Sequence, residues 1–187
     1  TTTATTNDTT PTIEGTSEAE SIINLSINGI STGDTAVTDV DGNFSITSSS
    51  ELSEGVNSIT VTSTDSLGNI SASSTPLLIT IDITPPNQPS ITTTTTLTND
   101  STPTIEGTAE AGSTVELFNG DTSLGTATAE SDGSFSITTG ELADDDYSLT
   151  VTATDAAGNT SSASTSLALT IDTAAPEAPV ITTTIDL

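Results

Sequence analysis

One unit of about ninety residues occurs twice in this chain, and that repeat constrains the fold more than any other feature. Residues 7–21 read NDTTPTIEGTSEAES, and residues 99–113 read NDSTPTIEGTAEAGS. Later in the unit, residues 78–89 (LITIDITPPNQP) match residues 168–179 (ALTIDTAAPEAP). A period of this length is too long for helical or leucine-rich repeats and is typical of one small β domain. The sequence therefore predicts tandem copies of one domain.

Prolines mark the boundary between the copies. Pro85, Pro86 and Pro89 favour a short, stiff, extended connector, and Pro176 and Pro179 repeat it after the second copy. We interpret the chain as a window on a longer array. The predicted organisation is a first repeat with a truncated first strand at 1–83, a Pro-rich linker at 84–89, a second repeat at 90–173, and a linker with the first strand of a third repeat at 174–187.

Apolar residues alternate with Thr and Ser, which is the pattern of half-buried strands. In residues 147–154 (YSLTVTAT), Tyr, Leu, Val and Ala fall on one face and hydroxyl residues on the other. This alternation argues against disorder, although aromatic residues make up only 2% of the chain. The strands predicted in the second copy are 90–98, 104–108, 114–118, a short strand within 122–130, 134–138, 147–154 and 164–171.

Short strands separated by turn signals every 8–12 residues indicate an antiparallel sandwich of the immunoglobulin type. We therefore predict an all-β fold of two tandem immunoglobulin-like sandwiches in an extended array. Tyr147 stands where such a fold has a tyrosine corner, whereas the first copy has Asn57 and is predicted to lack this feature.

The chain has 26 acidic residues and no Lys, Arg or His. Without a basic surface it is not expected to bind nucleic acid or an anionic membrane. Ser–His and Cys–His catalysis is excluded because His and Cys are both absent, so we expect no enzyme. Two carboxylates 4 Å apart repel by about 1 kcal/mol in water and about 4 kcal/mol near a protein surface. Any cluster of them therefore needs an external cation, and oxygen ligands favour Ca²⁺.

The sandwich topology predicts where such clusters form. The loops after the second and sixth strands lie at one end of each domain, which places Glu110 near Asp155 and Glu18 near Asp65. Asp82 ends the last strand of the first domain and is predicted to join Glu110 and Asp155 at the junction, with linker carbonyls and Asn159 completing a calcium site. Asp172 is predicted to serve a following domain. Asp8 and Asp100, in the NDxTP turns, lie near the opposite end of each domain, close to Asp82 and Asp172 respectively.

Ordinary turns are the alternative explanation for several of these residues. The Asp of NDxTP can cap a turn by accepting hydrogen bonds from backbone amides, and TDxxGN can be a plain loop. Residues 39–43 (DVDGN) resemble the start of a calcium loop but lack the length and the final Glu of an EF-hand. We predict a hairpin turn there.

Three segments of the second copy read TPTIEGTAEAGSTVELF, TVTATDAAGNTS and LTIDTAAPEAP. They resemble the bacterial immunoglobulin-like repeats of giant surface adhesins, which are the biofilm-associated and repeats-in-toxin adhesins exported by type I secretion. The resemblance implies calcium at interdomain junctions, held by the Asp of TID, the Glu of AEAG and the Asp of TDxxGN. Glu20 departs from the pattern where the second copy has Gly112, which predicts a differently shaped loop in the first copy.

The resemblance favours a structural spacer at the bacterial cell surface. Calcium would stiffen the array and project a distal adhesive domain in adhesion and biofilm formation, with adjacent repeats of the same chain as partners. Two alternatives stay open. One is a self-assembling extracellular fibre subunit, in which residues 180–187 complete the first strand of a neighbouring molecule through homotypic association. The other is a carbohydrate- or protein-binding module.

Overall fold

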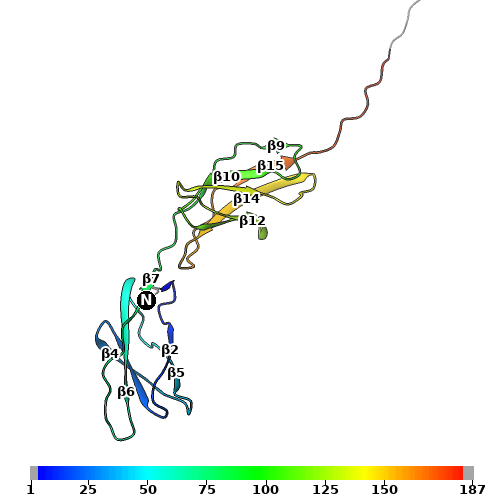
Figure 1. Ribbon diagram of the computed structural model, residues 1–187. Coiled ribbons are helices and arrows are strands. Elements are labelled where there is room, and N and C mark those ends of the chain that lie inside the picture. The colour runs from blue at the N-terminus through cyan, green and yellow to red at the C-terminus, as the bar shows by residue number, and fades with distance from the viewer. Residues whose placement is uncertain (1–3, 183–187) are drawn as a thin grey trace, which may run out of the picture. The chain divides into compact units, whose positions relative to one another are not determined.

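Alternating apolar and hydroxyl side chains form strands along the whole of the chain that the structure describes, residues 4–182 of a computed structural model. No residue in that part is helical, and it therefore holds no helix able to cross a membrane. The predicted all-β class is confirmed. Apart from the loop at residues 155–159, the chain divides into two compact units, with the boundary between Pro85 and Pro86. Each unit contains two sheets arranged on the same plan (Figure 1).

The first unit pairs a five-stranded sheet with a two-stranded sheet. In sheet order, the larger sheet contains β1 (Ala4–Thr6), β7 (Leu77–Ile81), β6 (Gly55–Thr64), β3 (Ile22–Ile27) and β4 (Ile30–Val37). The smaller sheet contains β2 (Thr12–Thr16) and β5 (Asn43–Thr47). Neighbouring strands are antiparallel except for β1, which runs parallel to β7.

The second unit repeats this arrangement and adds a strand to the smaller sheet. Its larger sheet contains, in order, β12 (Thr122–Thr128), β11 (Thr114–Asn119), β14 (Asp145–Thr154), β15 (Leu167–Ile171) and β9 (Leu97–Thr98). Its smaller sheet contains β13 (Ser134–Thr138), β10 (Thr104–Thr108) and β8 (Ser90–Ile91). In the second unit β9 takes the place of β1, again parallel to the last strand.

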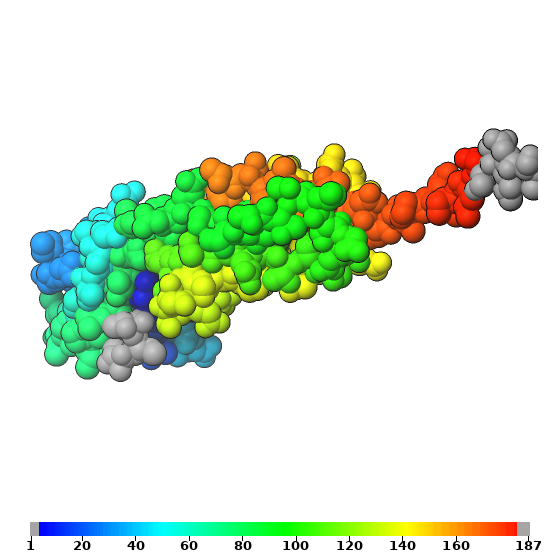
Figure 2. Space-filling view, turned by 90° about the horizontal axis from the view of Figure 1, so that it is seen from above, coloured from blue at the N-terminus to red at the C-terminus, as the bar shows by residue number. Residues whose placement is uncertain are grey.

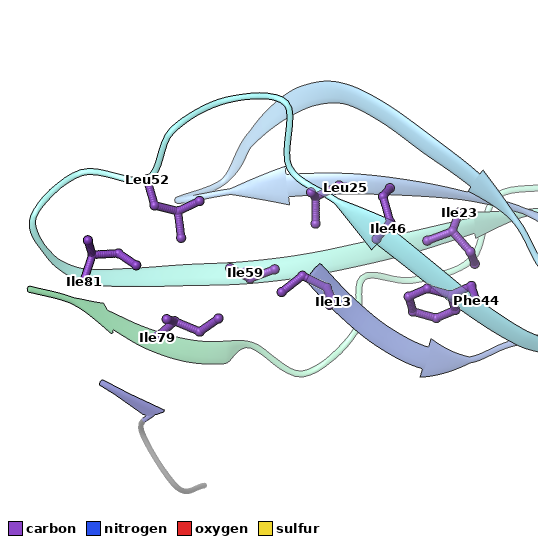
Figure 3. Packing of buried hydrophobic residues seen from close by; sticks show 9 residues of the cluster. All are labelled: Ile13, Ile23, Leu25, Phe44, Ile46, Leu52, Ile59, Ile79 and Ile81. Carbon is purple, nitrogen blue, oxygen red and sulfur yellow. The ribbon is translucent and has the colours of Figure 1, made fainter. Parts of the chain in front are cut away.

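The apolar residue of each alternating pair faces the space between the two sheets. In β13, Phe135 and Ile137 are buried while Ser134 and Ser136 are exposed. Nine such side chains form the core of the first unit, where Ile13 and Phe44 lie between the sheets (Figure 3). Full burial of each large aliphatic side chain contributes about 1.5–3 kcal/mol. These cores allow sequences that are so rich in Thr and Ser to fold.

The strand predicted at 90–98 is divided in the structure. Its first part, β8, pairs with β10, and its last part, β9, pairs with β15 in the other sheet. Between them, the chain crosses from one sheet to the other, while the N–H groups of Thr92 and Thr93 still donate to Glu106 O at 2.8 and 3.3 Å. Five consecutive threonines at 92–96 give no alternation that could mark this crossing.

The turn predicted at Asp39–Asn43 is present, but it does not join a hairpin. It connects β4 in the larger sheet with β5 in the smaller one. Gly42 has a φ of 83°, and a Cβ there would collide with Ser17 O, so the turn packs closely on the loop after β2. The expectation of a hairpin was wrong because a turn signal does not reveal which sheet receives the next strand.

The tyrosine corner is present, and the first domain has a substitute for it. Tyr147 Oη donates to Ala143 O, four residues earlier, at 3.0 Å. Asn57 is buried at the equivalent position, and its Nδ2 donates to Ser53 O, also four residues earlier, at 2.7 Å. Asn57 therefore makes the same kind of tie through an amide in place of a phenol.

Of the strand predicted at 180–187, the structure describes residues 180–182, and these form no strand. Residues 172–182 form no strand, and residues 183–187 lie outside the described residues, as do residues 1–3 at the predicted truncated first strand. Figure 2 shows the segment after β15 extending away from the body of the second domain.

Candidate functional site

Acidic residues gather at the end of each domain where its last strand finishes, which we call the exit end. In the first domain, β1 and β7 finish side by side, and the Asp82 N–H donates to Thr6 O at 3.0 Å. Asp8 follows β1 by two residues. Glu54 immediately precedes β6, whose first residue, Gly55, is paired with Ile81. Three separate segments thus bring Asp8, Glu54 and Asp82 to the exit end.

Each of these carboxylates caps nearby backbone. Asp82 Oδ1 accepts from the Thr84 N–H at 3.1 Å, and Asp8 Oδ1 accepts from the Thr10 N–H at 2.9 Å. Glu54 Oε2 accepts from the N–H of Ile83 at 3.2 Å, and its Oε1 accepts from the Thr84 hydroxyl at 3.1 Å. Carboxylates of two segments, Asp82 and Glu54, therefore hold the start of the linker.

The second domain repeats this exit end. Asp172 Oδ1 accepts from the Ala174 N–H at 3.0 Å, and Asp100 Oδ1 accepts from the Thr102 N–H at 2.8 Å. Asp144 Oδ1 accepts from both the N–H and the hydroxyl of Thr173, at 3.0 and 2.8 Å. The predicted proximity of Asp8 to Asp82 and of Asp100 to Asp172 thus has a structural basis in both domains, because the strands that precede them are paired.

Sequence reasoning missed Glu54 and Asp144. Glu54 immediately precedes β6 and Asp144 immediately precedes β14, and the two are separated by the same 90 positions as Asp82 and Asp172. That shared offset was a usable signal. It was hidden because the residue type changes from Glu to Asp and because residues 144–146 resemble a plain acidic loop.

The opposite end of each domain, which we call the proximal end, carries the TDxxGN loops. Asp155 Oδ1 accepts from the N–H groups of Ala157 and Asn159, both at 2.9 Å, and its Oδ2 accepts from Asn159 Nδ2 at 2.9 Å. Asp65 makes the same three bonds to Leu67 and Asn69, at 2.9, 2.8 and 2.7 Å. The plain-loop explanation therefore accounts for the shape of TDxxGN.

These hydrogen bonds favour the charged form of the aspartates. The Asn69 side chain, followed by its backbone N–H, lowers the pKa of Asp65 below its usual value. Desolvation acts to raise the pKa of Asp155, but the hydrogen bonds from Asn159 and Ala157 outweigh it and the pKa is lowered. Asp39, in a third TDxxGN sequence at 38–43, has a lowered pKa through its bonds from Asn43. Backbone amides and Asn side chains thus stabilise the charged carboxylates, as cationic side chains do in most proteins.

Glu18 and Glu110 lie in matching turns at the proximal end. The hydroxyls of Ser21 and Ser113 donate to Glu18 O and Glu110 O, both at 2.7 Å, and both carboxylates are on exposed residues. Glu20 has a φ of 59°, in the same left-handed region as Gly112 at 82°. The different loop shape expected from Glu20 is therefore not found, and the strain of a non-glycine residue in this region, about 1–2 kcal/mol, is tolerated.

Within each domain the predicted pairs share one end. Ile22 is paired with Thr64 and Thr114 with Thr154, so the turn of Glu18 and the loop of Asp65 adjoin, as do those of Glu110 and Asp155. In residues 4–182, no group of three or more acidic side chains lies close enough together to hold a metal ion. The convergence of Asp82 with Glu110 and Asp155 stays a prediction.

A family model described as "Bacterial Ig-like domain" matches residues 1–84 and again residues 83–173. The chain belongs to this family. The predicted tandem immunoglobulin-like sandwiches are thereby confirmed. The expectation that the chain is not an enzyme is confirmed as well, because bacterial Ig-like domains are a non-catalytic family. No curated protein sequence matches the chain.

Several solved structures are similar to this bacterial Ig-like chain. The fibronectin(III)-like modules of CbhA from Clostridium thermocellum share the fold, with a TM-score of 0.53, 14% identity, and coverage of 90% of this chain and 87% of that chain. A Ca²⁺-stabilised adhesin that helps an Antarctic bacterium reach out and bind ice is 27% identical over 89% of this chain and 45% of that one, with a TM-score of 0.46. The BSP domain of a biofilm-associated protein is 24% identical, with a TM-score of 0.39. That match covers 92% of this chain and 29% of the other chain.

Proposed function

We propose that this chain is a spacer segment of a large bacterial cell-surface adhesin, stiffened by calcium bound between successive Ig-like domains. Its role is to hold a distal adhesive domain away from the cell in adhesion and biofilm formation. The observation that carries this proposal is the repeated exit end. Asp8, Glu54 and Asp82 in the first domain recur as Asp100, Asp144 and Asp172 in the second, each set beside the linker that follows the last strand.

A repeated exit end supports a spacer because equivalent carboxylates in each domain hold the residues that follow its last strand. Two of these carboxylates in each domain, Glu54 with Asp82 and Asp144 with Asp172, accept hydrogen bonds from the first residues after the last strand and so limit the directions that the chain can take as it leaves the sandwich. The prolines that follow restrict it further. A chain of such units gains length from every domain, and its bending is confined to a few linker residues.

Calcium is the cation that fits the donors available. Every side-chain donor is an oxygen or an amide, with no His or Cys, which suits a hard divalent ion and not zinc. Calcium takes six to eight oxygens, whereas no three acidic side chains gather in the described residues. The proposal therefore requires ligands from more than one domain, with Asp82, Glu110 and Asp155 as its first candidates and Glu18, Asp65 and Asp172 at the corresponding positions towards further repeats.

A carbohydrate-binding module is less well supported. Such sites present aromatic side chains as platforms. In this chain Phe44 and Phe135 are 8% and 4% exposed and belong to the two cores, and Tyr147 packs against the second core. Three of the four aromatic residues thus serve the sandwiches, whereas Phe118 is half-buried and belongs to neither core.

The test compares calcium with a chelator on the whole chain. Titration calorimetry is expected to show binding near the 10⁻⁴–10⁻³ M range of extracellular modules. At ten times the dissociation constant, one ion adds about 1.4 kcal/mol to the free energy of unfolding. Small-angle scattering is expected to show a larger radius of gyration with calcium than with chelator, because the linker is then held straight.

Asp82→Ala is expected to lose most of the calorimetric heat, as it removes a carboxylate at the domain junction. The matched control is Asp121→Ala, which removes an exposed carboxylate in the turn between β11 and β12, away from the proximal end that holds Glu110. Equal binding by wild type and Asp82→Ala, or identical scattering with calcium and chelator, would contradict the proposal.

A further inference from the structure

A row of apolar side chains crosses the outer face of the larger sheet in the first domain. Ile22 is paired with Val37 on one side and with Thr64 on the other, and Thr64 is in turn paired with Ile70. Cross-strand partners lie on the same face, and the adjacent Ile23 is buried, so the row faces outward. Ile22, Val37 and Ile70 are 43%, 66% and 71% exposed. Three β-branched apolar side chains thus lie in one row on the surface.

The same row in the second domain consists of threonines. Thr114 is paired with Thr128 and with Thr154. Thr154 is paired with Thr160, and the hydroxyls of these two residues are 3.0 Å apart. The strand pairing is therefore the same in both domains, and the difference lies in the side chains alone.

This face of the first domain also lacks carboxylates. Asp34 is the only acidic residue in the described strands of the larger sheet, β1, β3, β4, β6 and β7. Its Oδ2 accepts from the N–H of Ser49, in the segment that follows β5 of the smaller sheet, at 3.0 Å. The carboxylate of Asp34 is therefore directed away from the outer face.

Charged side chains do stand on the corresponding face of the second domain. Glu116 and Asp146 alternate with core residues of β11 and β14 and therefore face outward. The first domain has Asn24 and Val56 at these two positions. Its outer face is thus neutral and partly apolar, in a chain whose net charge is −26.

We propose that this neutral face, the outer face of β3, β4, β6 and β7, is a docking surface for the same face of a second copy of the chain. Two copies repel each other wherever carboxylates come close, because neither copy has a positive side chain. The neutral faces can meet without bringing carboxylates together. Removal of Ile22, Val37 and Ile70 from water favours the contact, and sheets pack face to face about 10 Å apart.

The size of the neutral face predicts a weak dimer. Four strands about 4.8 Å apart, each about eight residues long at about 3.3 Å per residue, cover about 500 Å² per copy. A stable interface of standard size buries about 800 Å² per partner, so the contact falls in the range of transient association. A cationic partner fits this face less well, because it is attracted to the carboxylates elsewhere on the chain.

Sedimentation equilibrium of the whole chain in chelator tests the proposal without a contribution from calcium. Wild type is expected to form dimers as its concentration rises, more strongly at high NaCl, which screens the repulsion between copies. Val37→Asp is expected to weaken this association at least about tenfold, because it places a carboxylate in the contact. The matched control is Thr128→Asp, which adds the same charge at the equivalent position of the second domain and is expected to associate like wild type.

A second variant keeps the test valid if Val37→Asp fails to fold. Asn24→Glu combined with Val56→Asp gives the first domain the two acidic residues that the second domain already has at these positions. The sandwich accommodates them there, so the variant is expected to melt cooperatively and still to associate at least about tenfold more weakly than wild type.

The apolar contribution is measured without any change of charge. Replacement of Ile22, Val37 and Ile70 by Thr reproduces the threonine row of the second domain and is expected to weaken association as well. A wild type that stays monomeric up to about 1 mM would overturn the proposal. Dimers that none of these variants weakens, or that Thr128→Asp weakens equally, would overturn it too.

Discussion

At the scale of single residues, aspartate is stabilised here without any cationic partner. Asp39, Asp65 and Asp155 each accept backbone N–H bonds two and four residues ahead and bond the side-chain amide of the Asn in the same loop. Several N–H donors directed at one carboxylate favour its charged form, as a positive side chain would. A chain with no Lys, Arg or His can therefore keep ordered acidic loops.

We expect the contribution of Asp65 to depend on pH. Its pKa is lower in the folded chain than in the unfolded chain, so the unfolded state binds more protons as pH falls. Its stabilising effect is present above the unfolded pKa, about 3.9, and is lost as pH falls through the folded value. The difference in melting temperature between wild type and Asp65→Asn is thus expected to be largest near pH 7 and to shrink towards pH 3.

The control for this comparison is Asp41→Asn. It removes the same charge from an exposed turn, and the side chain of Asp41 accepts no hydrogen bond within the described residues. Its melting temperature should differ little from wild type throughout the pH series. A difference for Asp65→Asn that stays constant down to pH 3 would show that the hydrogen-bonded charge is not what stabilises the loop.

At the scale of strands, the two smaller sheets differ by one element, β8, within residues 4–182. Gly107 makes room both for the ring of Phe135 and for the carbonyl of Ser90, whereas Gly15 makes room for the ring of Phe44, whose Cζ would lie 2.6 Å from a Cβ placed there. The same glycine therefore meets one neighbour in the first domain and two in the second. A ring can shift more easily than a paired backbone can.

We expect Gly107→Ala to displace β8 from β10. The destabilisation should fall within the 1–3 kcal/mol typical of overpacking, and it should exceed that of Gly15→Ala. Amide hydrogen exchange at Thr92 reports on the strand directly, because its N–H donates to Glu106 O. Exchange at Thr92 should become faster in Gly107→Ala. Equal losses of stability in the two variants, with Thr92 still protected, would contradict the assigned role of this glycine.

At the scale of the whole chain, charge is the dominant feature. A net charge of −26 over 187 residues, without a single positive side chain, makes the folded state repel itself more than the expanded unfolded state does. The repulsion opposes the close approach of separate molecules. It also means that any cation in solution stabilises the folded chain to some degree.

We expect NaCl alone to raise the melting temperature. Between about 10 mM and 150 mM salt the screening length falls from about 30 Å to about 8 Å, which removes most long-range repulsion between exposed carboxylates. The measurement is thermal unfolding in chelator across this range, so that specific calcium binding does not contribute. A melting temperature that is constant or falls with salt would indicate that the carboxylates are too far apart to affect stability.

Much of the architecture could be predicted from the sequence. The alternating pattern located 104–108 and 134–138 as strands without error, because one face of each is buried and the period of two is explicit. The repeat predicted that the second domain would be built like the first. It also predicted that the turn of Glu110 and the loop of Asp155 share one end of that domain, and the pairing of Thr114 with Thr154 agrees with this.

Tertiary structure decided the features that depend on where a segment lies in space. Three features are of this kind. Residues 90–98 are divided between two sheets, Asn57 replaces the tyrosine corner, and Glu54 and Asp144 cap the linkers. A sequence pattern reports which face of a strand is buried, since that depends on neighbouring residues. It does not report which distant segment supplies the partner, because that choice is made by packing and hydrogen bonding once the sandwich has formed.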